Sequence, residues 1–263
     1  MTKYDHYLTL DFELHERILT VRFNSPDTLN ALTIACEAEL GQFLQDSAVD
    51  PDFDIAILTG AGRAFSAGGD MDAMLGNIAD PASFNVHLGK RLIFGLLDYP
   101  KPIIAKVNGH AVGLGATVAL YCDVVFAAEH AKIGDPHVQM GLCAGDGGAI
   151  IWPQLIGYAR AREYLMTGEL IPAPKAAELG LIGHCLPADQ LDAAVDEFAR
   201  KLSKGALKAI CATKRVVNLG LRQVASAVLD ASLAAEHLSI YSKEHEEAVH
   251  AFIEKRKPDF AGR

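Results

Sequence analysis

Residues 63–70 read RAFSAGGD, and a second glycine-rich stretch further along the chain, residues 108–115, reads NGHAVGLG. Each stretch follows a short apolar run that predicts a buried strand, residues 55–59 and 103–107, and each leads into an expected helix. Small residues in such turns let the backbone approach a ligand closely, and N–H groups at a helix start favour negative charge. Two turns of this kind that face one point would form an oxyanion hole from main-chain donors.

The two stretches, together with the end of the chain, resemble the signatures of the crotonase (enoyl-CoA hydratase/isomerase) superfamily. The first resembles its RAFSAGxD signature. The second, extended to residues 101–123, resembles the next family signature, and residues 252–260, FIEKRKPDF, resemble the usual ending. The resemblance implies an α/β fold, a crotonase-type spiral of ββα units with a C-terminal helical oligomerisation module. Residues 1–195 would form the core with the oxyanion hole and acyl-CoA site, and residues 196–263 the helical module.

The composition is that of an ordinary globular protein. Half of the 263 residues are hydrophobic and 22% are charged, so the chain can bury a large core and is not disordered. Its 24 basic against 33 acidic residues argue against a surface for nucleic acid or anionic membranes. Five cysteines without C-x-x-C spacing indicate free thiols and no zinc site. The N-terminus has no apolar signal core and no stretch has the length of a membrane span, so we expect a cytoplasmic protein.

Apolar periodicity predicts a hairpin over residues 7–23, a helix over residues 33–45, and strands over residues 54–59 and 123–127. Alternation of strands and helices favours an α/β domain. A long polar, glycine-rich segment, residues 134–148, is typical of a functional loop. From Ala149 onward the chain is expected to be mostly helical, and after Asp189 the pattern predicts four helices, over residues 189–203, 206–219, 222–240 and 243–256.

By position, the resemblance assigns the two oxyanion-hole donors to the main-chain N–H groups of Gly69 and Leu114. Leu114 is a departure, because relatives usually carry glycine there. The donor is a backbone group, so leucine can serve if its side chain points away from the thioester. A purely structural interpretation remains open, in which these turns only connect strand to helix tightly.

Residues near the two turns and at the C-terminus are expected to bind the substrate and its coenzyme A. Arg63 precedes the first turn, where relatives place a basic residue near the phosphates, and guanidinium suits phosphate by charge and geometry. Lys255 resembles a lysine that reaches coenzyme A, often from an adjacent subunit. The expected substrate- and CoA-binding residues are Arg63, Ala67, Gly68, Asp70, Phe252 and Lys255, of which Asp70 is also interpreted as a helix-start residue.

The expected acid–base residues differ from those of the best-known relatives. A crotonase hydratase uses two glutamates, one four residues after the position of Gly113 and one after the proline of a Gly-x-Pro-Glu motif. These positions hold Thr117 and His137 here. Threonine does not titrate usefully, whereas histidine is an acid or base near neutral pH. Addition of water by two glutamates is therefore not available in this chain.

Asp146, nine residues after His137 in the segment AGDGG, is the candidate replacement. The pattern of Pro-His followed by Gly-Asp-Gly resembles that of 6-oxocamphor hydrolase, a crotonase relative that cleaves a C–C bond in a cyclic β-diketone. A carboxylate in an apolar pocket gains basicity, and a neighbouring imidazole can exchange its proton. The alternative is that Asp146 caps the helix entered at Gly147, a favoured role for aspartate. Both interpretations stay open from the sequence.

Two further motifs carry less weight. Residues 245–250, HEEAVH, space their histidines five apart, which does not place them on one helix face, so they do not form a zinc motif. This segment is expected to be a solvated helix surface. Cys143 lies near His137 in sequence, but a free cysteine is more often inert packing than a nucleophile.

The sequence thus predicts an acyl-CoA-processing enzyme that holds a thioester carbonyl between the Gly69 and Leu114 amides, with His137 and Asp146 moving protons. Hydratase or isomerase action ranks first, and hydrolytic C–C cleavage of a β-dicarbonyl CoA ester ranks second. A non-catalytic CoA-binding paralogue is the alternative from another class. No metal and no permanent cofactor are expected, since coenzyme A arrives with the substrate, and the resemblance implies a homotrimer or hexamer.

Overall fold

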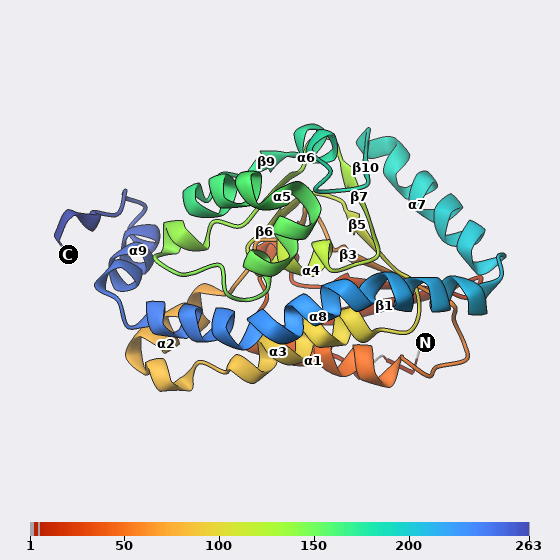
Figure 1. Ribbon diagram of the computed structural model, residues 1–263, viewed down its shortest axis with the longest axis horizontal. Helices are drawn as coiled ribbons and strands as arrows, with labels where there is room; N and C mark the ends of the chain where they lie inside the picture. The colour runs from red at the N-terminus through yellow and green to blue at the C-terminus, as the bar shows by residue number, and fades with distance from the viewer. Residues whose placement is uncertain (1–2, 5, 263) are drawn as a thin grey trace.

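The computed structural model describes residues 3–4 and 6–262, and Figure 1 shows two sheets surrounded by helices. The larger sheet has six strands in the order β1-β2-β3-β5-β7-β10. The first pair is antiparallel and every other pair is parallel. Its strands are β1 (Leu10–His15), β2 (Ile18–Phe23), β3 (Ile55–Gly60), β5 (Ile103–Val107), β7 (Val124–Ala128) and β10 (His184–Leu186).

A smaller sheet holds the two glycine-rich turns side by side. Its order is β4-β6-β8-β9, and β4 runs parallel to β6, with Ala64 opposite His110. The chain leaving both strands therefore reaches the same edge. Gly68 has φ of +91°, and a Cβ there would lie 2.7 Å from the Val112 carbonyl oxygen, so this approach requires glycine. The strands are β4 (Ala64–Ser66), β6 (His110–Val112), β8 (Lys132–Gly134) and β9 (Ile171–Pro172).

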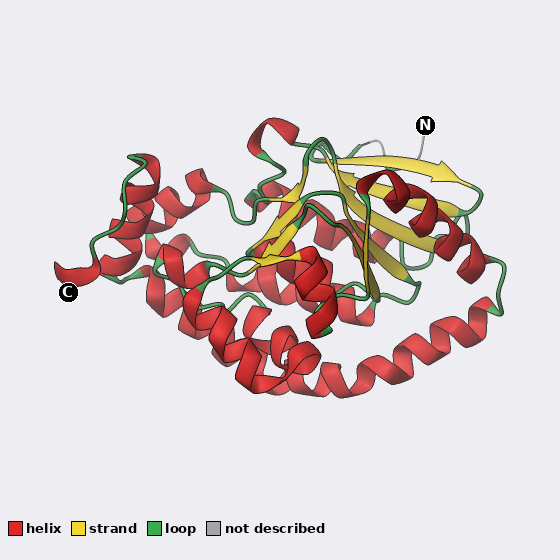
Figure 2. Ribbon diagram, turned by 90° about the horizontal axis from the view of Figure 1, so that it is seen from above, coloured by secondary structure: helices red, strands yellow, loops and turns green. Residues whose placement is uncertain are grey.

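Helices cover both faces of the larger sheet (Figure 2). Side chains alternate between the faces along β3, as the pleat requires: Ile57 packs with Leu191 and Val195 of α7, whereas Leu58 belongs to the main core. On the other side, α3 packs between α1 and α8 (Figure 1). The helices are α1 (Ile34–Asp46), α2 (Met71–Ala79), α3 (Val86–Asp98), α4 (Leu114–Leu120), α5 (Gly148–Thr167), α6 (Ala173–Leu179), α7 (Ala188–Ser203), α8 (Leu207–Ile240) and α9 (Lys243–Ile253), with short 3-10 helices at Pro26–Thr28, Pro81–Ser83, His137–Met140 and Phe260–Gly262.

Most of the predicted elements are confirmed, including the hairpin of β1 and β2 and both strand–turn–helix units. The predicted break near residue 220 is wrong, because α8 is a single helix of 34 residues that runs through Gly220. From Ala149 onward the chain is mostly helical, as predicted, and it also contributes two short strands, β9 to the smaller sheet and β10 to the larger one. Helix α7 crosses the predicted boundary between residues 195 and 196, and that division of the chain stays a prediction.

The polar segment over residues 134–148 is ordered by its neighbours. It contains a 3-10 helix, His137–Met140, that ends at Gly141 with φ of +66°. A Cβ on Gly141 would lie 2.5 Å from the main-chain nitrogen of His245, so this loop packs tightly against α9. Within residues 3–4 and 6–262, no helix combines the length and apolar character needed to cross a membrane.

Candidate active site

The N–H groups of Gly69 and Leu114 lie where the paired turns meet. Leu114 is the first residue of α4, and N–H groups of a first helical turn have no carbonyl partner within the helix. In the other turn, the Ala67 N–H donates to the Leu29 carbonyl at 2.9 Å and the Gly68 N–H to Ser66 Oγ at 3.1 Å. Both candidate donors border one cavity, which we call the inner cavity. Its lining also includes Glu37, Leu142, His137, Asp146, Leu233, Glu236, Ile240 and His245.

His137 stands between two carboxylates at the wall of the inner cavity. Its Nδ1 pairs closely with Asp135, and its Nε2 lies 3.3 Å from Asp146 Oδ2. Burial opposes a charged ring, but the carboxylates of Asp135 and Asp146 outweigh it and raise the pKa of His137 well above its usual range. In the same way, burial opposes ionisation of Asp146, but His137 holds the pKa of that carboxyl below its usual range. The pair therefore rests as imidazolium and carboxylate.

The second oxygen of Asp146 is held by the neighbouring helices. Asp146 Oδ1 accepts a hydrogen bond from Thr117 Oγ1 at 3.2 Å and a long one from the Gly148 N–H at 3.4 Å. The cap residue of α5 is Gly147, whose φ is +117°. Asp146 thus contributes weakly to the helix start and pairs with His137 at the same time. The three positions singled out from the sequence, Thr117, His137 and Asp146, meet at one point.

Three further acidic groups complete the site, none of which was predicted from the sequence motifs. Asp135 holds the far side of the His137 ring, and Glu236 of α8 places Oε1 4.0 Å from His137 Nε2. Burial and the charge of Asp146 raise the pKa of Glu236 well above its usual range. The same two causes raise the pKa of Glu37 to about 8. A signal for Glu236 did exist, since it interrupts the buried stripe Leu229, Leu233 and Ile240 along α8.

Asp135, His137 and Asp146 are also a set that could hold a metal ion, with ligand atoms within 4.8 Å of one another. Each ring nitrogen of His137 already faces a carboxylate, however. A metal would have to replace one of those contacts, and an imidazole between two carboxylates is an arrangement suited to proton transfer.

A second hollow, the outer cavity, adjoins the inner cavity, since Gly69 and His137 border both. Ala67, Gly68, Asp70 and Phe252 line it together with Met140. Asp70 accepts a hydrogen bond from the Ala73 N–H at 3.1 Å, which confirms it as the residue that starts α2. Phe252 is 59% exposed, at the rim.

Arg63 and Lys255 are exposed and lie outside the lining of both cavities. The structure therefore brings Ala67, Gly68, Asp70 and Phe252 together, but not these two cationic side chains.

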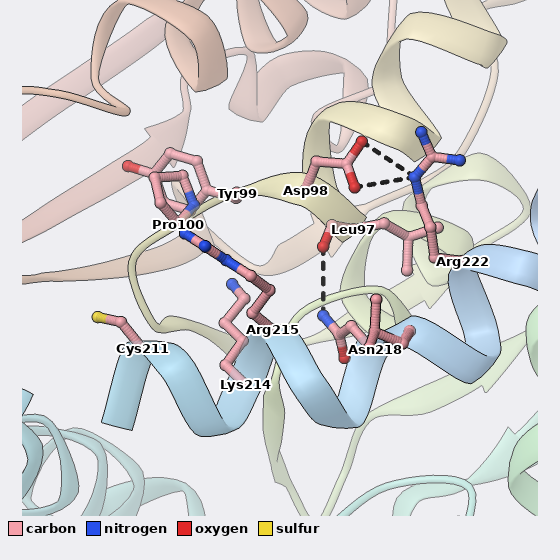
Figure 3. A pocket seen from close by; sticks show the side chains of 10 residues that line it. Leu97, Asp98, Tyr99, Pro100, Cys211, Lys214, Arg215, Asn218 and Arg222 are labelled. Carbon is pink, nitrogen blue, oxygen red and sulfur yellow. Dashed lines mark hydrogen bonds and ion pairs between the residues drawn. The ribbon is translucent and has the colours of Figure 1, made fainter. Parts of the chain in front are cut away.

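Another cavity lies between the end of α3 and the first half of α8 (Figure 3). Several of its polar side chains already have hydrogen-bond or ion-pair partners. Arg222 Nε contacts Asp98 Oδ1 at 2.9 Å, Asn218 Nδ2 donates to the Leu97 carbonyl at 3.3 Å, and Lys214 Nζ lies 2.7 Å from Asp123 Oδ2. Since these side chains already have partners, this cavity is a weaker candidate for the catalytic site than the inner cavity.

The sequence profile described as "Enoyl-CoA hydratase/isomerase" matches residues 13–263. The chain belongs to this family. A "2,3-dehydroadipyl-CoA hydratase" of Escherichia coli is 33% identical, with 94% of this chain and 96% of that protein covered. A "Crotonyl-CoA hydratase" of Syntrophomonas wolfei is also 33% identical, covering 97% and 98%. The crystal structure of an enoyl-CoA hydratase/isomerase from Mycobacterium paratuberculosis superposes with a TM-score of 0.89 at 36% identity, covering 94% and 99%.

The predicted crotonase superfamily and its α/β fold are thereby confirmed. As a member of the enoyl-CoA hydratase/isomerase family, the chain is an acyl-CoA-processing enzyme of the hydratase/isomerase type. The particular resemblance to 6-oxocamphor hydrolase stays a prediction.

Proposed function

We propose that this enzyme adds water to the double bond of an enoyl-CoA thioester, with His137 and Asp146 in place of the usual glutamates. One observation carries the proposal: the His137–Asp146 pair lines the same cavity as Gly69 and Leu114. A thioester whose carbonyl oxygen lies between those two N–H groups would present its carbon chain to the pair.

The oxyanion hole stabilises the charge that develops on the thioester oxygen. When water adds to the β-carbon, the electrons of the double bond move through the α-carbon toward that oxygen and form an enolate. The Gly69 and Leu114 N–H groups would each contribute on the order of 3 kcal/mol to this stabilisation.

The resting charges define the proton steps. The Asp146 carboxylate takes a proton from water while the water oxygen bonds to the β-carbon. The His137 imidazolium gives its Nε2 proton to the α-carbon. The proton on Asp146 then returns to His137 across the 3.3 Å contact. One water is added, and both groups recover their starting charge.

A second candidate reaction uses the same pair. The histidine–aspartate pattern resembles that of 6-oxocamphor hydrolase and favours C–C hydrolysis of a β-dicarbonyl CoA ester. Water activated by Asp146 would attack a carbonyl carbon, the bond from that carbon to the α-carbon would break, and His137 would protonate the leaving enolate.

The rest of the proposal follows the family. Arg63 and Lys255 would contact the phosphates of coenzyme A, Lys255 from a neighbouring subunit, and Phe252 would contact the adenine. We also propose a homotrimer or hexamer, without a permanent cofactor, in the cytoplasm. Free cysteines among the described residues suit that compartment.

The first test is incubation of the purified enzyme with a panel of enoyl-CoA and β-ketoacyl-CoA esters, with products followed by mass spectrometry. A gain of water with the chain intact supports hydration. A gain of water with a chain split or a ring opened supports C–C hydrolysis. Binding of CoA esters without conversion would favour a non-catalytic paralogue and overturn the proposal.

A further inference from the structure

His245 contradicts the prediction of a solvated surface for residues 245–250, because it is only 1% exposed whereas His250 is exposed. Its Nδ1 lies 2.7 Å from the Met140 carbonyl oxygen. A carbonyl only accepts hydrogen bonds, so Nδ1 carries the proton and Nε2 presents a lone pair. Burial keeps the pKa of His245 below its usual range, which maintains the neutral ring.

Nε2 of His245 is buried and has no hydrogen-bond partner among the described residues. His245 lines the inner cavity beside Ile240 and Leu142. A buried polar atom without a partner destabilises the fold, so an apolar wall of similar shape would be more stable. The lone pair is therefore best explained by a hydrogen-bond donor that enters the cavity.

Glu236 borders the same cavity and is also incompletely paired. The residue is 5% exposed, and its Oε2 has no partner in the described structure. Burial and the nearby charge of Asp146 raise the pKa of Glu236 well above its usual range, which favours the protonated carboxyl. A protonated carboxyl both donates and accepts hydrogen bonds.

The residues that line the inner cavity also disfavour an acyl group that ends in a carboxylate. Among the described residues that border the inner cavity there is no lysine or arginine, whereas Glu37, Asp146 and Glu236 are all present. A carboxylate at the end of an acyl chain would find no unpaired cation among these residues, because the His137 imidazolium already pairs with Asp135 and Asp146, and it would face the negative charge of Asp146.

We propose that the acyl group of the substrate carries a hydroxyl group beyond its reacting carbons, which donates to His245 Nε2 and accepts from the Glu236 carboxyl. A hydroxyl suits this place because it is donor and acceptor at once. A plain alkyl chain leaves both buried groups unpaired, and sites built to bind a hydroxyl reject analogues that lack it. This inference rests on the proposed function, whose substrate class it narrows.

Binding of saturated thioesters tests the inference, because they have no double bond to hydrate. Calorimetry would compare hexanoyl-CoA with its 4-, 5- and 6-hydroxy derivatives and with adipyl-CoA, which ends in a carboxylate. At least one hydroxy derivative should bind about tenfold more tightly than hexanoyl-CoA, and adipyl-CoA should bind most weakly.

The variants His245→Leu and Glu236→Leu should each remove the preference for the hydroxy derivative over hexanoyl-CoA. Glu236→Gln retains a donor and an acceptor and should keep most of the preference. His250→Leu, on the exposed side of α9, is the matched control and should bind every ester like the wild type.

Equal binding of hexanoyl-CoA and all its hydroxy derivatives by the wild type would overturn the inference and leave the proposed function standing. This comparison needs no variant, so it holds even if His245→Leu fails to fold. Failure of every CoA ester to bind would instead overturn the proposed function.

Discussion

The protonation of His137 is decided by its two carboxylate neighbours rather than by its own chemistry. A histidine in water loses its proton near pH 6.5, but Asp135 and Asp146 keep this ring protonated well above that. At neutral pH the site therefore holds a proton donor and a carboxylate acceptor 3.3 Å apart. Acid and base are both available before substrate binds.

Replacing Asp146 tests this arrangement. Asp146→Asn removes the acceptor and also lowers the pKa of His137, because one of the two charges that stabilise the imidazolium is lost. We expect kcat to fall about 100-fold or more, with binding of a saturated acyl-CoA nearly unchanged. Steady-state kinetics and calorimetry measure the two quantities.

Asp196→Asn, an exposed position on α7, is the control and should retain wild-type kcat. Wild-type turnover in Asp146→Asn would remove this carboxylate from the mechanism.

Glu37 should make the fold more stable in mild acid than in mild base. The folded protein keeps the Glu37 proton up to pH about 8, whereas the unfolded chain loses it near 4.5. The folded state thus binds more protons between these values, so this group's contribution to the free energy of unfolding falls as pH rises across the window. Glu37→Gln removes the effect, and its Tm should exceed that of wild type increasingly from pH 5 to pH 8.

Thermal melts across this range measure the difference, at about 2–4 °C for each kcal/mol in a chain of this size. A Tm difference between the two proteins that does not change with pH would show that Glu37 ionises normally.

The part of the candidate site that lies in recognisable sequence motifs could be predicted. Gly69, Leu114, His137 and Asp146 stand in or beside recognisable turns, and they line one cavity. Glu236 comes from a helix 90 residues after Asp146, and only packing of α8 against the loop brings them together. A long-range contact of this kind leaves no local pattern beyond a polar residue in an apolar stripe.

At the scale of the elements, α8 shows how packing overrides a local preference. Gly220 predicts a break, since glycine in a helix interior costs about 1 kcal/mol relative to alanine. The helix nevertheless continues for 34 residues, because Leu229 and Leu233 farther along bury their side chains in the main core. Strands β9 and β10 were missed for another reason: at two and three residues they are too short to show alternation.

Gly220→Ala should stabilise the protein. A Cβ at this position meets nothing within 4 Å, and the backbone is already helical. We expect a gain of about 1 kcal/mol in the free energy of unfolding, equivalent to a Tm higher by about 2–4 °C.

Gly141→Ala is the contrasting variant and should lower the Tm, because its φ is +66° and its Cβ would press on the backbone of α9. Denaturation followed by circular dichroism measures both. Equal effects of the two substitutions on Tm would contradict the expected clash between a Cβ at position 141 and the backbone of α9.

At the scale of the whole molecule, the first half of α8 presents apolar side chains to the surface. Val216, Val217 and Leu219 are 66%, 72% and 54% exposed. Contiguous exposed apolar groups mark interaction sites in folded proteins. They agree with the expectation that this helical region supports contacts between subunits.

Sedimentation velocity tests the proposed homotrimer or hexamer and should show an assembly of three or six chains. Val217→Lys places a charge among these exposed apolar side chains. It should shift the sedimentation distribution toward smaller species, with the circular dichroism spectrum unchanged. Lys208→Ala, elsewhere on the exposed surface of α8, is the control. A wild-type protein that sediments as a single chain at micromolar concentration would contradict the expected oligomer.

The two contacts of the His137 ring also bear on stereochemistry. With Nδ1 held by Asp135 and Nε2 directed toward Asp146, the ring cannot turn over without breaking both interactions. A donor fixed in this way approaches the planar enolate from one side only. In heavy water, the α-carbon of the product should therefore carry its deuterium in a single configuration, and the product would record the orientation of one imidazole.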